Sequence, residues 1–275
     1  MNILTFDIEE WIVYSYYSKG GKNYFLPILD RYLDDLLHLL DKYDHNATFF
    51  CLGQLAKEYP NVIKRIIERG HDIGCHSNAH SLVTNMNPDS FFKDTQLALQ
   101  CLEDVSGKKV ISYRAPAFSI TEKNKWAFEI LLNLGIQYDS SIFPALRSFG
   151  GFPSLSISQP FILKYGKKEL KEFPINVRKV LGKNVAFSGG GYFRLAPYSC
   201  IKKWTEESLY TMTYFHIRDF DKEQKVVYSL RYFQSYYGIK KAFEKLEKYL
   251  TDFQFLTLET ANKEIKWENS PIISL

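Results

Sequence analysis

The sequence predicts an α/β fold, a closed or nearly closed barrel of seven or eight strands that alternate with helices. Short apolar runs alternate with longer amphipathic ones along most of the chain, which is the pattern of a parallel sheet with crossover helices. The chain has 275 residues, 45% of them hydrophobic, and a barrel of about 250 residues would use nearly all of it. No repeat or low-complexity linker divides the chain. We therefore expect one domain over residues 1–275 and favour the barrel over an open doubly wound sheet.

The first half of the chain gives regular signals. Short apolar runs predict strands, and apolar residues three and four apart predict helices, as the leucines of 27–43 illustrate. Gly70, Gly107 and Gly135 follow three of these helices, where glycine commonly ends a helix. The expected strands are 3–8, 47–52, 72–76, 110–114 and 136–138, and the expected helices are 27–43, 61–69, 89–105 and 122–134.

The second half begins with a break in this pattern. Gly, Pro and Ser recur between residues 148 and 191, which predicts loops and small strands rather than a separate domain. Regularity then resumes. We expect a helix over 197–207 with Pro197 in its first turn, a strand over 210–216, a helix over 228–250 and a last strand over 253–258.

Composition excludes some classes of function. The net charge is +4 and no long basic block is present, so nucleic acid binding is not indicated. No apolar run approaches about 18 residues, so no membrane span is expected. The N-terminus runs directly into a strand-like stretch without the features of a signal peptide, which favours a cytoplasmic location. The many aromatic residues could line a sugar-binding cleft, although most are expected in the core.

Unusual polar residues follow the predicted strands. In a β/α barrel the chemistry lies at the carboxyl ends of the strands, so these side chains are expected to meet at one rim. Each of them alone has a simpler explanation, such as a surface ion pair, a turn residue or a histidine of the core. The residues are Asp7, Glu9, Glu10, His76, Arg114, Asp139 and His216.

Two of these segments suggest a metal site. His76 and His80 would share one face if the residues after the strand turned helical, and imidazoles are common ligands of Zn²⁺. Asp7 and Glu9 are two apart in an extended segment, so their side chains point the same way. One carboxylate could bind the metal while the other acts as a base. A solvated acidic loop and two chance histidines are the alternative.

The chain resembles the NodB-homology polysaccharide deacetylases, carbohydrate esterase family four, whose fold is a distorted barrel related to the TIM barrel. The resemblance rests on five segments in the family's order, spread over residues 5 to 216. They are Thr5-Phe6-Asp7-Ile8-Glu9-Glu10, His76-Ser77-Asn78-Ala79-His80, Arg114-Ala115-Pro116, Asp139-Ser140-Ser141 and Tyr214-Phe215-His216. The opening through Trp11 and the glycine-rich stretch 188–194 are similar to the subgroup found beside exopolysaccharide export genes. The motif-bearing core would span about residues 2–220.

The resemblance implies a mechanism for removing acetyl groups from an N-acetylated sugar or polysaccharide. Glu9, His76 and His80 would hold one divalent ion, with Zn²⁺ as the expected metal, which would polarise the acetyl carbonyl and lower the pKa of a water molecule. Asp7 would be the general base and His216 the general acid. Arg114 would orient Asp7, and Asp139 would pair with His216 and raise its pKa. A backbone N–H near Ala117 would stabilise the oxyanion. The substrate would be contacted by Ala117, Phe118, Gly190, Gly191 and Tyr192.

The sequence departs from the family in two places. The family's adjacent Asp-Asp pair is replaced by Asp7-Ile8-Glu9-Glu10, in which pleated geometry favours Glu9 as the metal ligand and Glu10 is the alternative. Ile217 follows the last histidine where the subgroup often has proline. Two other functions stay open: hydrolysis of a small amide or cyclic ureide on the same barrel, and an inactive glycan-binding protein. A glycosidase is disfavoured, because its signature is two separated carboxylates without metal-binding histidines. The sequence leaves the sugar and the oligomeric state open.

Overall fold

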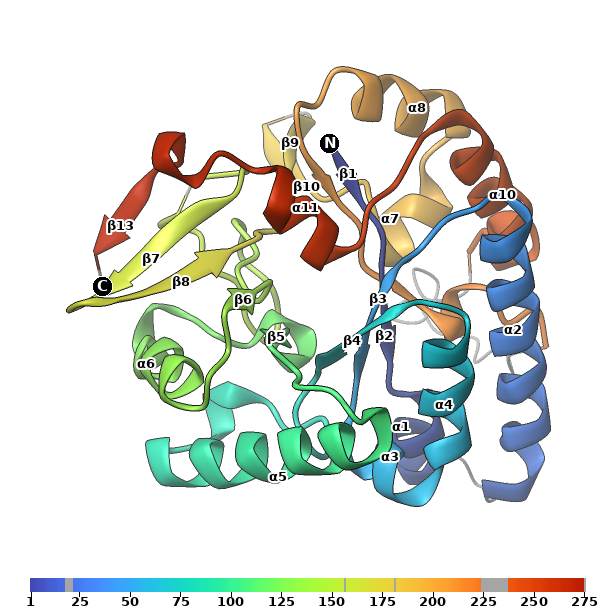
Figure 1. Cartoon of the computed structure of the whole chain (residues 1–275). Helices are drawn as coiled ribbons and strands as arrows, with labels where there is room; N and C mark the ends of the chain where they lie inside the picture. The colour runs from blue at the N-terminus through green and yellow to red at the C-terminus, as the bar shows by residue number, and fades with distance from the viewer. Residues whose placement is uncertain (18–21, 156, 181, 224–236, 275) are drawn as a thin grey trace.

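The computed structural model describes residues 1–17, 22–155, 157–180, 182–223 and 237–274. Thirteen strands alternate with helices within these ranges, and Figure 1 shows α2, α4 and α5 around the outside of the central strands. The strands are β1 Asn2–Ile3, β2 Thr5–Ile8, β3 Thr48–Cys51, β4 Asp72–Cys75, β5 Ser112–Tyr113, β6 Tyr138–Asp139, β7 Phe161–Tyr165, β8 Lys168–Glu172, β9 Arg178–Val180, β10 Lys183–Val185, β11 Thr211–Met212, β12 Phe215–His216 and β13 Ile272–Ser274.

The α-helices of the described residues lie mainly between these strands. They are α1 Glu10–Tyr17, α2 Lys22–Lys42, α3 Gly53–Glu58, α4 Pro60–Glu68, α5 Pro88–Ser106, α6 Trp126–Asn133, α7 Gly190–Leu195, α8 Tyr198–Glu206, α10 Ala242–Asp252 and α11 Leu258–Glu264. Short 3-10 turns are η1 Val83–Asn85, η2 Pro116–Phe118, η3 Glu122–Asn124, η4 Ile217–Asp219, η5 Ile239–Lys241 and η6 Trp267–Asn269. None of the described helices is both long and apolar enough to cross a membrane.

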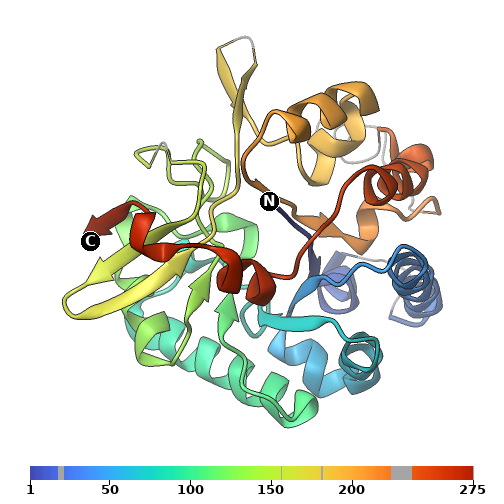
Figure 2. The same ribbon diagram turned by 45° about the horizontal axis from the view of Figure 1, so that its top comes forward.

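The main sheet confirms the predicted parallel arrangement. Its nine strands follow the order β12-β2-β3-β4-β5-β6-β8-β7-β13, and every neighbouring pair is parallel except the β7–β8 hairpin. The strands curl into a distorted barrel in which β12, from late in the chain, lies beside β2. Nine strands exceed the expected seven or eight because the hairpin and β13 extend one end. Strands β1 and β11 form a second parallel pair, and the β9–β10 hairpin projects from the body (Figure 2).

Most predicted elements of the first half are confirmed within a few residues. Gly107 follows α5 with a left-handed φ of 68°, as its predicted role requires. The region from 148 to 191 contains loops and the small strands β7 to β10, as expected. The predicted helix 122–134 is divided into η3 and α6, and the predicted strand 210–216 into β11 and β12.

Three predictions for the last third need correction. The strand expected over 253–258 is wrong: Leu256 makes only an isolated bridge to Ile3, and α11 begins at Leu258. The helix expected over 228–250 includes 228–236, which lie outside the described residues, and its described part starts late, at Ala242. Pro197 precedes α8 as its N-cap instead of lying inside the first turn. For residues 253–258, apolar spacing identified a largely buried segment but not its conformation.

Gly74 in β4 lets the sheet support a buried cation. A Cβ at this position would lie 2.5 Å from the ring of Phe50 and 2.7 Å from Oγ of Ser112. Without that Cβ, the Phe50 ring lies across the strand, and the guanidinium carbon of Arg114 sits 4.3 Å from the ring centroid. A glycine is needed here because the aromatic ring approaches the backbone closely.

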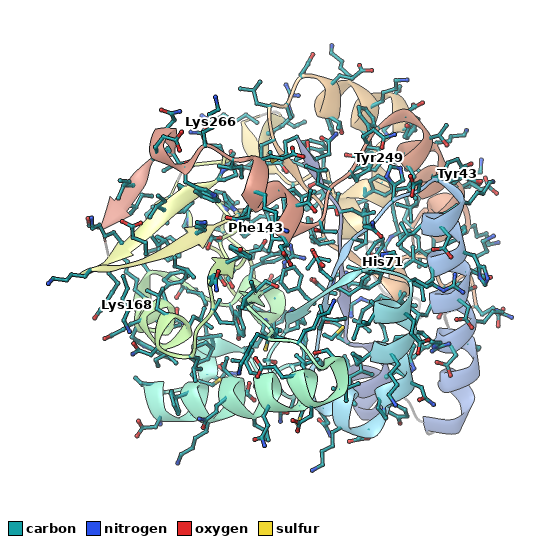
Figure 3. All side chains as sticks on the ribbon, viewed as in Figure 1. Tyr43, His71, Phe143, Lys168, Tyr249 and Lys266 are labelled. Atoms are coloured by element: carbon teal, nitrogen blue, oxygen red, sulfur yellow. The ribbon has the colours of Figure 1, made fainter. Side chains whose placement is uncertain are left out.

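His71 is buried just before β4, where Figure 3 labels it, and packs against Phe49. Neither of its ring nitrogens has a hydrogen-bond partner among the described residues. Burial disfavours the imidazolium and lowers the pKa of His71 to about 4. The folded protein therefore keeps this ring neutral under conditions in which an unfolded chain would protonate it.

The lowered pKa of His71 predicts that acid destabilises the fold. Because the folded pKa lies below the unfolded value of 6.5, the contribution of His71 to stability is fully present above pH 6.5. It is lost as the pH falls towards 4, by about 3 kcal/mol. Urea unfolding over this pH range should show that His71→Leu loses less stability than the wild type. The exposed His38→Gln serves as control and should follow the wild type. Equal acid sensitivity of His71→Leu and the wild type would contradict this account.

Candidate active site

The two carboxylates at the end of β2 face one site, as their spacing predicted. Asp7 and Glu9 are both buried. The His216 ring lies beside both, because β12 pairs with β2 in a register that places His216 next to Asp7. Its Nε2 atom is 3.8 Å from Oδ2 of Asp7 and 4.0 Å from Oε1 of Glu9. Residues more than 200 positions apart are thus brought together by one strand pair.

His76 and His80 converge on Glu9, but not on a helix. The segment after β4 is irregular, and Ser77 and His80 have left-handed φ values of 70° and 58°. The backbone N–H of His80 donates to Oγ of Ser77 at 3.0 Å, which stabilises this turn. The conditional expectation of a helical face is therefore wrong. The turn instead places Nε2 of His80 2.6 Å and Nε2 of His76 3.4 Å from Oε2 of Glu9.

These three side chains fit a divalent cation. Glu9, His76 and His80 each offer one ligand atom, and the three atoms lie within 4.8 Å of one another. Nδ1 of His76 lies 2.8 Å from the carbonyl oxygen of Arg114, so with its proton on Nδ1 the ring presents Nε2 as the ligand atom. Within the described part of the chain, this is the one group of three His, Cys, Asp or Glu side chains with such spacing.

The electrostatics favour an ionised Glu9. Burial by itself raises the pKa of this carboxyl group, but Arg218, His80 and His216 outweigh burial and hold the pKa well below its usual value. Arg218 contributes directly, since its Nη1 lies 2.8 Å from Oε1 of Glu9. The two carboxylate oxygens are thus divided: Oε2 faces the histidines and Oε1 faces Arg218.

Glu10, the alternative metal ligand, points elsewhere. It is the first residue of α1, and its carboxylate accepts hydrogen bonds from the backbone N–H groups of Arg218, at 3.2 Å, and Glu9, at 3.3 Å. Burial and the neighbouring charge of Glu9 raise the pKa of Glu10 to about 7. Glu10 does not belong to the three-residue group around His76 and His80.

Arg114 is fully buried and joins Asp7 to the rest of the site. Its Nη1 donates to Oδ1 of Asp7 and to Oγ1 of Thr5, both at 2.8 Å, and its Nη2 donates to Oγ of Ser140 at 2.9 Å. This is the contact expected for Arg114. It leaves Oδ2 of Asp7 as the oxygen that faces His216.

The expected pairing of Asp139 with His216 is wrong. Asp139 accepts hydrogen bonds from the backbone and side chain of Ser141, at 3.0 and 2.7 Å, and it lies beside Glu172 in the β6–β8 pair. Burial raises the pKa of Asp139, and burial and the Asp139 charge raise the pKa of Glu172 well above its usual value. Ser141 in turn accepts the N–H of Ala115 at 2.8 Å, which connects Asp139 to the segment after Arg114.

Asp219 takes the place predicted for Asp139. Its Oδ2 lies 3.3 Å from Nδ1 of His216 and accepts the His216 N–H at 3.0 Å, while Oδ1 pairs with buried Arg194. Burial and Arg218 lower the pKa of His216, but Asp219 and Glu9 outweigh them and raise it. The sequence signal for Asp219 was its position three residues after His216, where a tight turn brings the two side chains together.

The proposed substrate contacts lie on two segments. Ala117 and Phe118 form a turn with left-handed φ values of 51° and 54°, and the Phe118 ring is buried against Phe143 and Tyr214. On the second segment, Gly190 and its neighbours pack against Tyr214. A Cβ at Gly189 would lie 2.3 Å from the carbonyl oxygen of Tyr214, so glycine permits a close backbone approach there. Gly191 lies in α7, and Tyr192 is 43% exposed.

Two family models match the chain. Residues 3–138 match the model described as polysaccharide deacetylase, and residues 140–263 match a domain of unknown function, DUF3473. The peptidoglycan-N-acetylglucosamine deacetylase of Bacillus cereus is 34% identical over 95 residues, which are 34% of this chain and 34% of that protein. The peptidoglycan-N-acetylmuramic acid deacetylase of Bacillus subtilis is 30% identical over 90 residues, 33% of this chain and 19% of that protein. The matched segments thus span about a third or less of these relatives.

One solved structure superposes on this chain over the whole length of the chain. A Mycobacterium smegmatis protein assigned to the polysaccharide deacetylases superposes with a TM-score of 0.69 and 19% sequence identity. The superposition covers 100% of this chain and 92% of that one. This likeness confirms the fold class, the distorted barrel, that the sequence motifs had implied.

The different positions of the Glu9 and Glu10 side chains predict that substituting them changes the affinity for Zn²⁺ to different extents. Glu9→Gln should weaken Zn²⁺ binding by more than the roughly 100-fold that loss of an outer-shell partner can cost, because it removes a charged ligand atom. Glu10→Gln is the matched control and should bind nearly as tightly as the wild type. Isothermal titration calorimetry measures both. A larger loss in Glu10→Gln than in Glu9→Gln would reverse the assignment.

The position of Asp219 predicts how His216 titrates. In metal-free protein, Asp219→Asn should lower the pKa of His216, because the imidazolium loses its carboxylate acceptor. Asp139→Asn should leave the titration of His216 in place, since its hydrogen bonds go to Ser141. NMR of the histidine ring signals provides the titration curves. A larger change in the His216 pKa in Asp139→Asn than in Asp219→Asn would instead support the pairing of Asp139 with His216.

Proposed function

We propose that this chain, whose residues 3–138 match the polysaccharide deacetylase model, is a metal-dependent deacetylase that hydrolyses the acetamido group of an N-acetylated saccharide. The observation that carries the proposal is the convergence of Glu9, His76 and His80, with Asp7 and His216 beside them. A metal site flanked by a base and an acid is what amide hydrolysis requires.

The resident ion is Zn²⁺ in this proposal. Two imidazoles and one carboxylate form a common ligand set of catalytic zinc, in which a further position stays open for water or substrate. When bound, the ion supplies a Lewis acid that polarises the acetyl carbonyl and lowers the pKa of water. Glu9 and the two histidines would hold it, with His76 oriented by the carbonyl of Arg114.

Asp7 is the general base. Its Oδ1 is bound by Arg114, so Oδ2 is the oxygen that takes a proton from the attacking water. The guanidinium fixes the orientation of the carboxylate. The backbone N–H of Ala117, on the left-handed turn after Pro116, would stabilise the oxyanion of the tetrahedral intermediate.

His216 is the general acid. Asp219 holds its Nδ1 side, so Nε2 is the nitrogen that faces Asp7 and donates a proton to the departing sugar amine. Asp139 acts at a distance in this scheme. Through Ser141 it holds the N–H of Ala115 and thereby the turn that carries Ala117.

The substrate is a polymer or oligomer of N-acetylated sugar. The names of the curated relatives point to N-acetylglucosamine or N-acetylmuramic acid in peptidoglycan, and the glycine-rich stretch keeps an exopolysaccharide as a candidate. Gly190, Gly191 and Tyr192 would contact it from α7. We also propose that residues 1–275 form one domain, since the strand pairs β12–β2 and β6–β8 join the two matched segments.

Acetate release from a panel of N-acetylated saccharides tests the proposal. The metal-loaded protein should release acetate, and a chelator should abolish release until Zn²⁺ is restored. His216→Ala should lower kcat by about 10²- to 10⁴-fold, the usual contribution of a positioned acid, while metal binding persists. His38→Gln controls for loss of a histidine. Absence of acetate release from every N- and O-acetylated sugar would overturn the function.

A further inference from the structure

Arg147 is exposed and lies in the loop between β6 and β7, beside the turn that carries Ala117. Its guanidinium carbon is 4.4 Å from the ring centroid of Phe143, labelled in Figure 3, and 5.7 Å from that of Phe118. Both rings are buried, so they form a fixed floor under the cation. The guanidinium also interacts electrostatically with the Tyr214 hydroxyl group. Contact with the two rings restricts the side chain before any ligand arrives, which reduces the entropic cost of binding.

The charge of Arg147 has no counter-charge in the described structure. Seven other arginines are described, and each lies within ion-pair distance of a carboxylate. Among the described residues, no carboxylate is found within 4.0 Å of Arg147. A positioned guanidinium without a carboxylate partner offers N–H donors to an anion from solution.

This free cation is close to the proposed chemistry. The Phe118 ring lies near two guanidiniums: the guanidinium carbon of Arg147 is 5.7 Å from its centroid, and that of Arg114, which holds Asp7, is 5.8 Å from it. Tyr214, which interacts electrostatically with Arg147, precedes the proposed acid His216 by two residues. A group bound by Arg147 could therefore belong to the same saccharide chain as the reacting acetamido group.

The loop around Arg147 offers apolar surface as well. Leu146 is 84% and Phe149 is 55% exposed. The loop is held in place, because Asn184 of β10 donates to the carbonyl of Pro144 at 3.2 Å and the N–H of Gly151 donates to the carbonyl of Phe118 at 2.9 Å. Exposed apolar side chains beside polar groups are typical of binding sites, and the C–H faces of a sugar ring suit such a surface.

We propose that Arg147 is a specificity-determining residue that binds a carboxylate on the substrate, so that the site takes an acidic saccharide. The N-acetylated sugar would then stand next to a uronic acid or another carboxylated sugar. The planar guanidinium matches a carboxylate with two parallel hydrogen bonds, since stacking on Phe143 leaves its edge available. This inference rests on the proposed function, because it names the substrate class of the same site.

The test compares oligosaccharides that differ only in the carboxylate. One is an alternating glucuronic acid and N-acetylglucosamine oligomer, and the other is the same oligomer with its carboxyl groups reduced to alcohols. Calorimetry on metal-free protein measures both Kd values without turnover. The wild type should bind the acidic oligomer about 10- to 100-fold more tightly, the range of hydrogen bonds between charged groups.

Arg147→Gln should bring the ratio of the two Kd values to about one. Arg147→Lys should keep part of the preference, because charge remains but the two-donor edge is lost. Arg69→Gln, which removes a distant surface charge paired with Asp41, should behave like the wild type. An unchanged ratio in Arg147→Gln would overturn the proposal. Tighter binding of a sulfated oligomer than of the carboxylated one would overturn the choice of carboxylate.

Acetate release separates this inference from the proposed function. If the metal-loaded wild type deacetylates both oligomers equally well and Arg147→Gln changes neither, the function stands and the role of Arg147 falls. If no oligomer yields acetate but the binding preference is present and is lost in Arg147→Gln, the acid-binding role stands and the deacetylase function falls.

Discussion

The buried guanidinium of Arg114 is the interaction on which the rest of the site depends. It is fully enclosed, and a charge removed from water is tolerated only where partners compensate it. Its donors reach Asp7 and Thr5 on β2 and Ser140 after β6, and its carbonyl oxygen lies within hydrogen-bonding distance of His76 after β4. One residue thus fixes the ends of several parallel strands relative to one another. The metal-ligand group and the candidate base therefore share one anchor.

The surroundings of the other buried carboxyl groups likewise determine whether each group is charged. Arg218 and the neighbouring His80 and His216 hold the pKa of Glu9 well below its usual value, whereas Glu10, one residue later, has a pKa raised to about 7 by burial and by the charge of Glu9. Asp139 and Glu172 form a carboxyl pair in which burial favours the protonated form. Adjacent carboxyl groups therefore differ in charge because their surroundings differ. Glu9 faces His76 and His80, and Asp139 is connected through Ser141 to the backbone of Ala115.

The two matched segments are interdependent in chemistry. The metal-ligand group and Asp7 come from residues 3–138, which match the deacetylase model. His216, with Arg194, Asp219 and Arg218 around it, comes from the segment matched by the domain of unknown function. The pairing of β12 with β2 joins the two halves at the position where His216 lies next to Asp7. A site divided in this way needs both halves folded together.

The sequence by itself determined the alternation of strands and helices and the expectation that the polar residues after the strands meet at one rim. These follow from local periodicity and from the rule that parallel strands place their carboxyl ends on one rim. The grouping of Glu9 with His76 and His80, and the contact of Arg114 with Asp7, were implied by the resemblance to the deacetylase family. Only the tertiary structure decided that Asp219 partners His216, that the His76–His80 segment is a left-handed turn, and that residues 253–258 form no strand. Apolar spacing records whether a segment is buried, but the partner of a charged group depends on which chain ends become neighbours after folding. That information is distributed over the whole molecule.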